Sequence, residues 1–274
     1  MAADQFVVAN GARLHWREWG GHARAALLIV HGFSTHARTW DQVAEALGDR
    51  FRVLALDLRG HGESQWTAEY SLEALDADVI AFARAANLGR FALVGHALGG
   101  GIALRLAAAH PALVERLVVI EALPPVSTDG RAAPPVMETP PDVLRDPGEA
   151  LSFFRERVPR VPLEDLRGWV ERYRRPTVDG RWTWGHDPAF RDGTRPGRGP
   201  ARDAASGSAE LRAVACPTLL VRGGESMLCS RNAQDRLAAA IRGARTVELA
   251  GAGHLAHLED PAGLTAALRA FLVP

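Results

Sequence analysis

The chain has 274 residues, of which 47% are hydrophobic and 23% are charged, a balance typical of soluble globular proteins. Its 32 basic and 32 acidic residues cancel, so no net field attracts nucleic acid or an anionic membrane. Two cysteines are too few for a disulfide framework, and no apolar run approaches the roughly 18 residues of a membrane span. The N-terminal residues show no signal peptide. We therefore expect a cytoplasmic protein that binds neither nucleic acid nor membranes.

Predicted strands and helices alternate along the first part of the chain. A hairpin is expected over 6–19, because two apolar stretches flank the turn-forming pair Asn10-Gly11. Further along, continuous apolar runs indicate strands buried on both faces, and helical spacing indicates the elements between them. These strands are expected at 25–30, 51–56, 91–94 and 117–120, and the helices at 39–47, 71–86 and 98–109.

The alternation stops between 126 and 208, where prolines cluster and short amphipathic helices are predicted around 147–157 and 163–174. The segment 193–207 is rich in Gly, Pro, Arg and Ser, which is typical of a loop. The alternation then resumes with helices expected at 209–214, 232–241 and 261–272 and strands at 218–221 and 245–249. We expect a core of residues 1–125 and 209–274, interrupted by an inserted cap of residues 126–208.

Reactive side chains follow several of the predicted strands. Strand-helix alternation with buried runs implies a mostly parallel sheet with helices on both faces. Ligands of such sheets bind at the carboxyl ends of the strands. We therefore expect residues that are distant in sequence to lie at one edge of the sheet, namely His31, Asp57, Ala97, Glu121, Glu225 and His254.

The segment 93–100 has the pattern Gly-x-Ser-x-Gly without its serine. Gly95 and Gly99 are present, but Ala97 stands where the nucleophile would be. Small residues are required there because the nucleophile sits on a strained turn between a strand and a helix. We call the turn at 95–99 the elbow.

Four motifs together resemble the α/β-hydrolase fold, and within it the capped serine hydrolases. They are His31-Gly32-Phe33, Asp57-Leu58-Arg59-Gly60-His61-Gly62, the elbow and Gly253-His254, in this order. The resemblance covers almost the whole chain. It implies a mostly parallel eight-stranded sheet flanked by helices, an inserted helical cap, and a Ser-His-acid mechanism. From the apolar side chains of the cap we expect a hydrophobic ester, lactone or polyketide-like substrate, and hence an esterase or lactonase. No motif in the cap identifies the substrate.

The resemblance also implies roles for residues near the elbow. His254 would be the base that takes the nucleophile's proton. The backbone amides of Phe33 and Leu98 would form the oxyanion hole. Asp57 and the motif around it are expected to hold the neighbouring loop rather than to take part in the chemistry.

The acid that orients His254 has two candidates. Glu121 ends a buried apolar run, where an ionisable group is costly unless it is paired, and it resembles the strand-six glutamate of some haloalkane dehalogenases. Glu225 follows the strand after which the acid usually comes, but it lies one or two residues early. We favour Glu121, and the alternatives of Glu225 or of neither residue stay open.

The substrate is expected to be a small hydrophobic organic molecule. Four cap aromatics, namely Trp169, Tyr173, Trp182 and Trp184, could line an apolar pocket or pack the cap onto the core. At the strand ends, two histidines and a serine are further candidate contacts, although His96 is also expected to pack or hydrogen-bond locally. The candidate substrate-binding residues are therefore His31, Ser34, His96, Trp169, Trp182 and Trp184.

No cofactor is predicted. The glycines of the elbow do not follow G-x-G-x-x-G, a P-loop is excluded because the chain has no lysine, and no metal-ligand spacing is present. We expect a monomer or a homodimer.

Ala97 leaves more than one interpretation open. In the first, which we favour, the chain is an engineered variant of a serine hydrolase, inactivated by replacement of its nucleophilic serine with alanine. In the second, the alanine is natural and His254 acts as a general base in a lyase, cyclase, isomerase or cofactor-free oxygenase. In the third, the protein only binds a ligand. The absence of an aspartate near Met227 favours a natural alanine, whereas Glu121 weakens that argument by supplying another acid.

Overall fold

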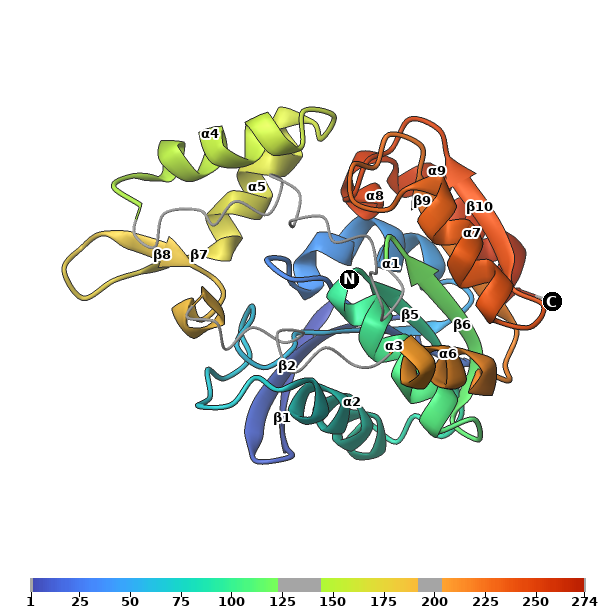
Figure 1. The fold of residues 1–274 in the computed structure, drawn as a ribbon. Coiled ribbons are helices and arrows are strands. Elements are labelled where there is room, and N and C mark those ends of the chain that lie inside the picture. The colour runs from blue at the N-terminus through green and yellow to red at the C-terminus, as the bar shows by residue number, and fades with distance from the viewer. Residues whose placement is uncertain (1, 123–143, 192–203, 274) are drawn as a thin grey trace.

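A computed structural model of the chain describes residues 2–122, 144–191 and 204–273. An eight-stranded sheet forms the centre of the molecule (Figure 1). β2 pairs antiparallel with β1 and β4, and the remaining neighbours are parallel. This architecture confirms the predicted α/β-hydrolase fold. The strands, in spatial order, are β1 (Ala3–Ala9), β2 (Ala12–Trp19), β4 (Arg52–Leu56), β3 (Ala26–Val30), β5 (Phe91–His96), β6 (Val114–Ile120), β9 (Thr218–Gly223) and β10 (Arg245–Leu249).

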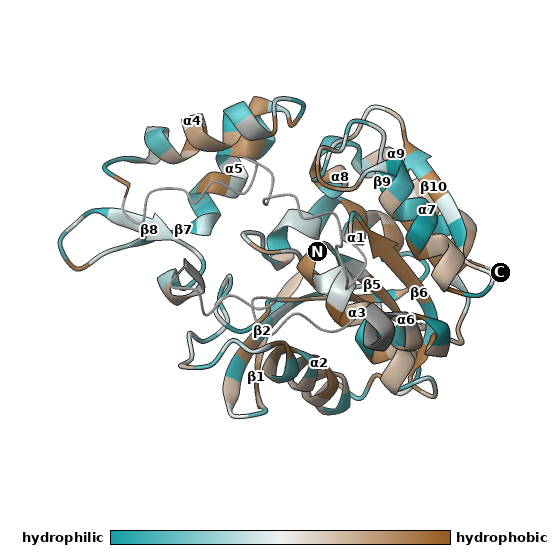
Figure 2. Cartoon of the chain, in the orientation of Figure 1, coloured by the Kyte–Doolittle hydropathy of each residue, from teal (hydrophilic) through white to brown (hydrophobic). Residues whose placement is uncertain are grey.

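Helices cover both faces of the sheet, as the buried strands require. In β4, Leu54 and Leu56 join the core on one face, while Val53 and Ala55 join the core on the other. Central strands with apolar side chains on both faces account for the continuous apolar runs in the sequence, and Figure 2 shows β6 among the most hydrophobic parts of the molecule. The first face carries α2 (Leu72–Ala85), α3 (Leu98–Ala109), α6 (Ala204–Ala213) and α7 (Arg231–Ala240), and the second carries η1 (Ala37–Trp40), α1 (Asp41–Leu47), α8 (Ala256–Glu259) and α9 (Pro261–Leu272).

Local signals placed several boundaries correctly. The β1–β2 turn has Asn10 at φ 48° and Gly11 at φ 73°, the left-handed pair that a two-residue hairpin needs. Ser71 caps α2 by accepting a hydrogen bond from the Ala74 amide at 3.2 Å. The predicted last helix begins at Pro261, as expected.

The cap contains α4 (Pro147–Arg157), α5 (Leu163–Tyr173) and η3 (Pro188–Arg191), together with a hairpin that the sequence did not lead us to predict. β7 (Arg174–Pro176) pairs antiparallel with β8 (Trp182–Trp184). The Asp179-Gly180 pair between them, with Gly180 at φ 80°, was the available signal. The predictions for 126–143 and for most of the 193–207 loop lie outside the described residues.

The predicted boundary between cap and core at residue 208 falls within α6, which runs from Ala204 to Ala213. This helix packs against α3, and Leu211 is buried in the core cluster on that face. The division into core and cap stays a prediction. Among the described residues, no helix has the length and apolar character needed to cross a membrane.

The first testable prediction concerns two neighbouring glycines of α3. A Cβ at Gly99 would lie 2.2 Å from the carbonyl oxygen of Val30, so the helix can approach β3 only with glycine there. At Gly101 the nearest atom to a Cβ is the end of the Arg105 side chain, 3.6 Å away. We expect Gly99→Ala to lower the free energy of unfolding by about 3 kcal/mol. Gly101→Ala should raise it by roughly 0.5–1 kcal/mol. Chemical denaturation measures both, and equal stability of the two variants would contradict the proposed close approach.

Candidate active site

Ala97 occupies the sharp turn between β5 and α3. Its backbone lies at φ 49° and ψ −110°, a conformation that non-glycine residues rarely adopt. The Ala97 amide donates to the carbonyl of Ile120 at 2.9 Å, and its carbonyl accepts from the amide of Gly101 at 3.1 Å. The elbow is therefore held in a strained conformation by β6 on one side and by the helix on the other.

The loop after β3 lies directly against the elbow. A Cβ at Gly32 would be 3.2 Å from the Cβ of Ala97. The Gly32 carbonyl accepts hydrogen bonds from the Thr35 hydroxyl at 2.8 Å and from Nδ1 of His31 at 2.7 Å. Because the carbonyl and the amide of a trans peptide point in opposite directions, the Phe33 amide faces away from these donors.

The second predicted oxyanion donor belongs to α3. The helix begins at Leu98, so the amide of this residue has no intrahelical acceptor. A free amide at the positive end of a helix dipole is suited to stabilising a developing negative charge. The roles of Phe33 and Leu98 as oxyanion donors stay predictions.

His31 has another role than the predicted contact with substrate. It is fully buried, its Nε2 accepts from the amide of Leu58 at 3.0 Å, and its Nδ1 bonds to Gly32. Both ring nitrogens are thus used within the chain. Burial also lowers the pKa of His31, which keeps the ring neutral. The residue ties the loop after β3 to the loop after β4.

Glu121 and His254 meet beside the elbow. His254 Nδ1 lies 3.1 Å from Oε2 of Glu121, although the two residues are 133 positions apart. The second carboxylate oxygen of Glu121 accepts from the amide of Gly223 at 2.7 Å, and the hydroxyl of Ser226 donates to Oε2. Glu121 itself has φ 53°, so the chain turns sharply where it leaves β6.

Burial dominates the acid-base properties of this pair. It raises the pKa of Glu121 to about 7, although hydrogen bonds from Ser226 and Gly223 act in the opposite direction. Burial lowers the pKa of His254 to about 4. His254 is therefore neutral near pH 7. When Glu121 is ionised it accepts a hydrogen bond from Nδ1–H of His254, which keeps the proton on Nδ1 and leaves the lone pair on Nε2.

Glu225, the alternative acid, lies away from this pair. Its side chain is 56% exposed, and it faces the cap residue Arg160 at 3.6 Å. Of the two sequence candidates, only Glu121 has a carboxylate oxygen within hydrogen-bonding distance of His254 in the described residues. The neighbouring Ser226, which stands where an aspartate was expected, hydrogen-bonds to Glu121 instead.

His96 was also predicted to contact substrate, and its local-packing alternative describes it better. The ring is buried, and its Nε2 donates to the carbonyl oxygen of His254 at 2.9 Å. Burial lowers the pKa of His96 to about 3, so the ring is neutral. Behind it, the rings of His257 and Trp40 are stacked with their centres 4.4 Å apart. His96 thus joins the elbow to the loop that carries His254.

Asp57 and Arg59 support the surrounding loops, as expected. Asp57 accepts hydrogen bonds from the Ala37 amide at 2.6 Å and from His15 at 2.7 Å. Burial acts to raise the pKa of Asp57, but His15 holds it well below its usual value. Arg59 binds the buried carboxylate of Asp78 through two hydrogen bonds of 2.6 Å.

The cap tryptophans mostly pack the cap itself. Trp169 and Trp184 are buried, and their rings lie 4.2 and 5.2 Å from the ring of Phe154. This is the packing role that the sequence left open, and a substrate pocket lined by these two residues stays a prediction. Trp182 is half-buried under the guanidinium of Arg174, 3.9 Å from the ring centre.

Further ring contacts connect the cap to the loop after β3, and two of their members, His36 and His186, were not predicted from the sequence. Tyr173 is stacked on His36 with ring centres 5.4 Å apart, and its hydroxyl hydrogen-bonds to His186. His186 in turn lies 5.1 Å from the ring of Phe33. Ser34, predicted to bind substrate, is half-buried at φ 59°, close to the side chain of Tyr173. Nothing in the sequence periodicity of the cap indicated these contacts.

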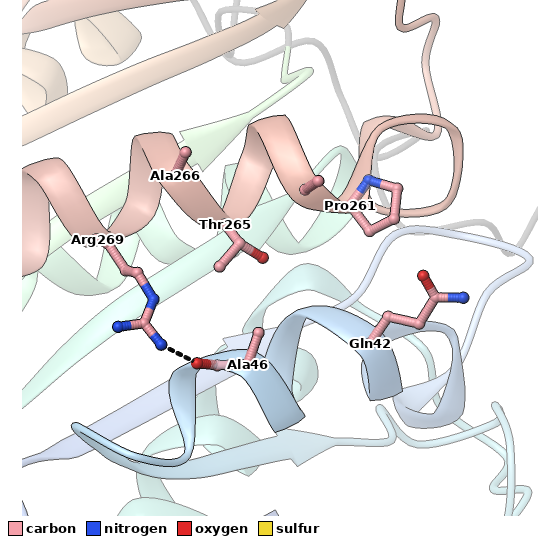
Figure 3. Close-up of a pocket in the computed structure, with 7 residues that line it drawn as sticks. Gln42, Ala46, Pro261, Thr265, Ala266 and Arg269 are labelled. Carbon is pink, nitrogen blue, oxygen red and sulfur yellow. Dashed lines mark hydrogen bonds between the residues drawn. The ribbon is translucent and has the colours of Figure 1, made fainter.

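A surface hollow of about 470 Å³ lies elsewhere, between α1 and α9 (Figure 3). None of the predicted site residues lines it. Its lining residues are Gln42, Ala46, Pro261, Ala262, Thr265, Ala266 and Arg269. Within the described parts of the chain, no group of three His, Cys, Asp or Glu side chains could hold a metal ion.

Comparisons with known proteins identify relatives of this chain. Residues 27–268 match the alpha/beta hydrolase family. An esterase of Mycobacterium tuberculosis is 31% identical over 93% of this chain and 84% of its own length. N-formylmaleamate deformylase of Pseudomonas putida is 42% identical over 47% of this chain, and a lipase of Mycobacterium tuberculosis is 36% identical over 50% of it. The chain spans about half the length of these last two relatives, 48% and 52%.

Solved structures cover the chain more completely. E-2-(acetamidomethylene)succinate hydrolase superposes with a TM-score of 0.88 at 26% identity and covers 100% of both chains. A thioesterase domain from the curacin biosynthetic pathway has a TM-score of 0.84 at 23% identity, over 98% of this chain and 99% of its own. At this level of identity the likeness shows that the fold is shared and nothing more.

The strain at the elbow gives a second prediction. Because glycine adopts positive φ at little cost, Ala97→Gly should raise the free energy of unfolding by about 1 kcal/mol. The matched control is Ala266→Gly on the exposed face of α9, which should lower it by about 1 kcal/mol. Thermal and chemical denaturation measure both variants. If Ala97→Gly were as destabilising as the control, the elbow would not be strained.

Proposed function

Because the chain belongs to the α/β-hydrolase family, we propose that it carries the catalytic frame of a carboxylic-ester hydrolase of the esterase or lactonase type, in which Ala97 replaces the nucleophilic serine. By catalytic frame we mean the elbow, the two oxyanion amides and the Glu121–His254 pair. The observation that carries the proposal is the hydrogen bond of 3.1 Å between His254 and Glu121 beside the strained Ala97.

With a serine at position 97, each part of the frame has a defined task. The serine oxygen attacks the acyl carbon while Nε2 of His254 takes its proton, and Glu121 stabilises the imidazolium through Nδ1. The amides of Phe33 and Leu98 bind the oxyanion. His254 then protonates the leaving alkoxide, and a water molecule activated by the same histidine releases the acid. The present sequence lacks the oxygen that begins this series.

The named relatives support acyl chemistry. They are called an esterase, a lipase and a deformylase, and the structural neighbour of 26% identity is called a hydrolase of an acetamidomethylene succinate. Ester, lactone and amide cleavage share the tetrahedral intermediate that the frame would stabilise. A small hydrophobic ester or lactone is our proposed substrate class.

The completeness of the Glu121–His254 pair without a nucleophile favours a second candidate. A neutral His254 with its lone pair on Nε2 can abstract a proton directly from a substrate. In that case the present chain is active with its natural alanine, as a lyase, cyclase, isomerase or cofactor-free oxygenase.

Restoring the oxygen tests both candidates. We expect Ala97→Ser to react with a fluorophosphonate and to hydrolyse p-nitrophenyl acetate, because in the catalytic triad of subtilisin the serine alone is worth a factor on the order of 10⁶ in kcat. His254→Ala in the same background should abolish both reactions. The control is Ala109→Ser at the far end of α3, which should do neither.

Three other outcomes separate the alternatives. An Ala97→Ser variant that is neither labelled nor active on esters and lactones would contradict the hydrolase proposal. Turnover by the unchanged chain that His254→Ala abolishes would establish the general-base candidate. Saturable ligand binding without turnover in either form would indicate a binding protein.

The raised pKa of Glu121 predicts the pH profile of the Ala97→Ser variant. Only ionised Glu121 keeps the proton of His254 on Nδ1, so kcat/KM should rise with pH through about 7 and fall below it. His254, whose pKa is about 4, stays neutral over this range and adds no step of its own. In the Glu121→Gln, Ala97→Ser double variant the step near 7 should disappear and the rate should fall. A step near 6.5 that survives this change would instead indicate an exposed histidine.

A further inference from the structure

The loop that carries His254 is held by a second glutamate. Glu259, at the end of α8, has a side chain that is only 4% exposed. One carboxylate oxygen accepts from the amide of Gly253 at 2.9 Å, and the other accepts from the amide of Leu255 at 3.0 Å. The two bonded amides lie immediately before and after His254.

The residues around this contact fit the carboxylate closely. A Cβ at Gly253 would lie 3.0 Å from both oxygens of Glu259, so glycine gives the carboxylate room to reach the amide. The carbonyl of His254 is bound from the opposite side by His96, the neighbour of Ala97. The backbone around His254 is thus held by three hydrogen bonds: the flanking Gly253 and Leu255 amides donate to Glu259, and His96 donates to the His254 carbonyl.

We propose that Glu259 is a positioning residue, which aligns the imidazole of His254 with Glu121 and with the side chain at position 97. The proposed catalytic consequence rests on the proposed function, whereas the structural consequence does not. Hydrogen bonds from backbone amides to a carboxylate are charge-assisted and stronger than those between neutral groups. A fixed backbone leaves the imidazole only its two side-chain torsions, and the hydrogen bond to Glu121 restricts these.

Glu259 also connects this loop to the cap. Nη1 of Arg160 lies 3.9 Å from Glu259, and Nη2 of the same residue lies 3.6 Å from Glu225. Glu225 precedes Ser226, which donates to Glu121. One cap arginine therefore faces both loops that hold the pair. Because Arg160 is 43% exposed, we expect its contribution to be small and reduced by salt.

The structural consequence is tested first in the unchanged chain, with Ala97 in place. We expect Glu259→Gln to raise the hydrogen-exchange rate of the Gly253 or Leu255 amide about tenfold, because an amide group can accept only one of the two bonds. The ring resonances of His254 should shift in the NMR spectrum. Glu259→Asp, one methylene shorter, should not restore the native spectrum.

The matched control is the adjacent Asp260. Its side chain accepts from the Gly263 amide at 2.9 Å and caps α9 without touching the His254 backbone. Asp260→Ala, which removes this cap, should lower the melting temperature, yet leave exchange at Gly253 and Leu255 and the His254 resonances unchanged.

The catalytic consequence is tested in the Ala97→Ser background. Glu259→Gln should lower kcat about tenfold with little change in KM, because a misaligned base affects the transition state more than substrate binding. Asp260→Ala should leave both constants unchanged. An equal loss of kcat in the two variants would overturn the positioning role and indicate general destabilisation.

The two proposals fail separately. If Ala97→Ser is inactive, the hydrolase proposal is refuted, and the exchange and NMR measurements still decide the role of Glu259. If Ala97→Ser is active but Glu259→Gln changes neither kcat, amide exchange nor the His254 resonances, the positioning proposal is wrong.

Discussion

The contact between Glu121 and His254 depends on a carboxylate that the fold has taken out of water. Such a group is costly to bury unless hydrogen bonds replace its hydration. Glu121 receives these bonds from the Gly223 amide, the Ser226 hydroxyl and His254. The backbone amide of Glu121 also donates to the Val221 carbonyl at 2.9 Å, which extends the β6–β9 pairing by one residue. The register of two parallel strands therefore places the carboxylate at the histidine.

Strain at the elbow is maintained by the same sheet. Ala97 is held at positive φ because its amide is bound to Ile120, the residue before Glu121, and because Gly95 and Gly99 allow strand and helix to approach closely. The strained turn and the buried acid are thus both attached to the end of β6. A methyl group gains nothing from this conformation, whereas a reactive side chain would be presented to a substrate by it. The strain therefore supports the proposal that this turn presents a catalytic residue at position 97.

The sequence predicted those features that depend on local pattern or on the cost of burial. Continuous apolar runs located the central strands, and the ionisable Glu121 after such a run was favoured as the acid for the same reason. Features that depend on side-chain direction were not predictable. Trp169 and Trp184 are of a residue type common in ligand pockets, yet they pack against Phe154. His31 and His96 are of a residue type common in binding sites, yet their hydrogen bonds join loops of the protein to one another. The alanine-rich start of α6 lay in a segment whose glycines and serines indicated a loop.

The parts of the site are held mainly by contacts that involve the backbone, so the missing hydroxyl at position 97 does not disturb their arrangement. Glu121 is fixed by the strand register, the loop of His254 by His96 and Glu259, and the loop after β3 by the bonds to the Gly32 carbonyl. None of these contacts uses the side chain at position 97. Leu255, next to His254, also packs in the hydrophobic cluster of the cap, so the cap stabilises the same loop. A serine at this position would therefore enter a site already formed, because the arrangement of its partners does not depend on it.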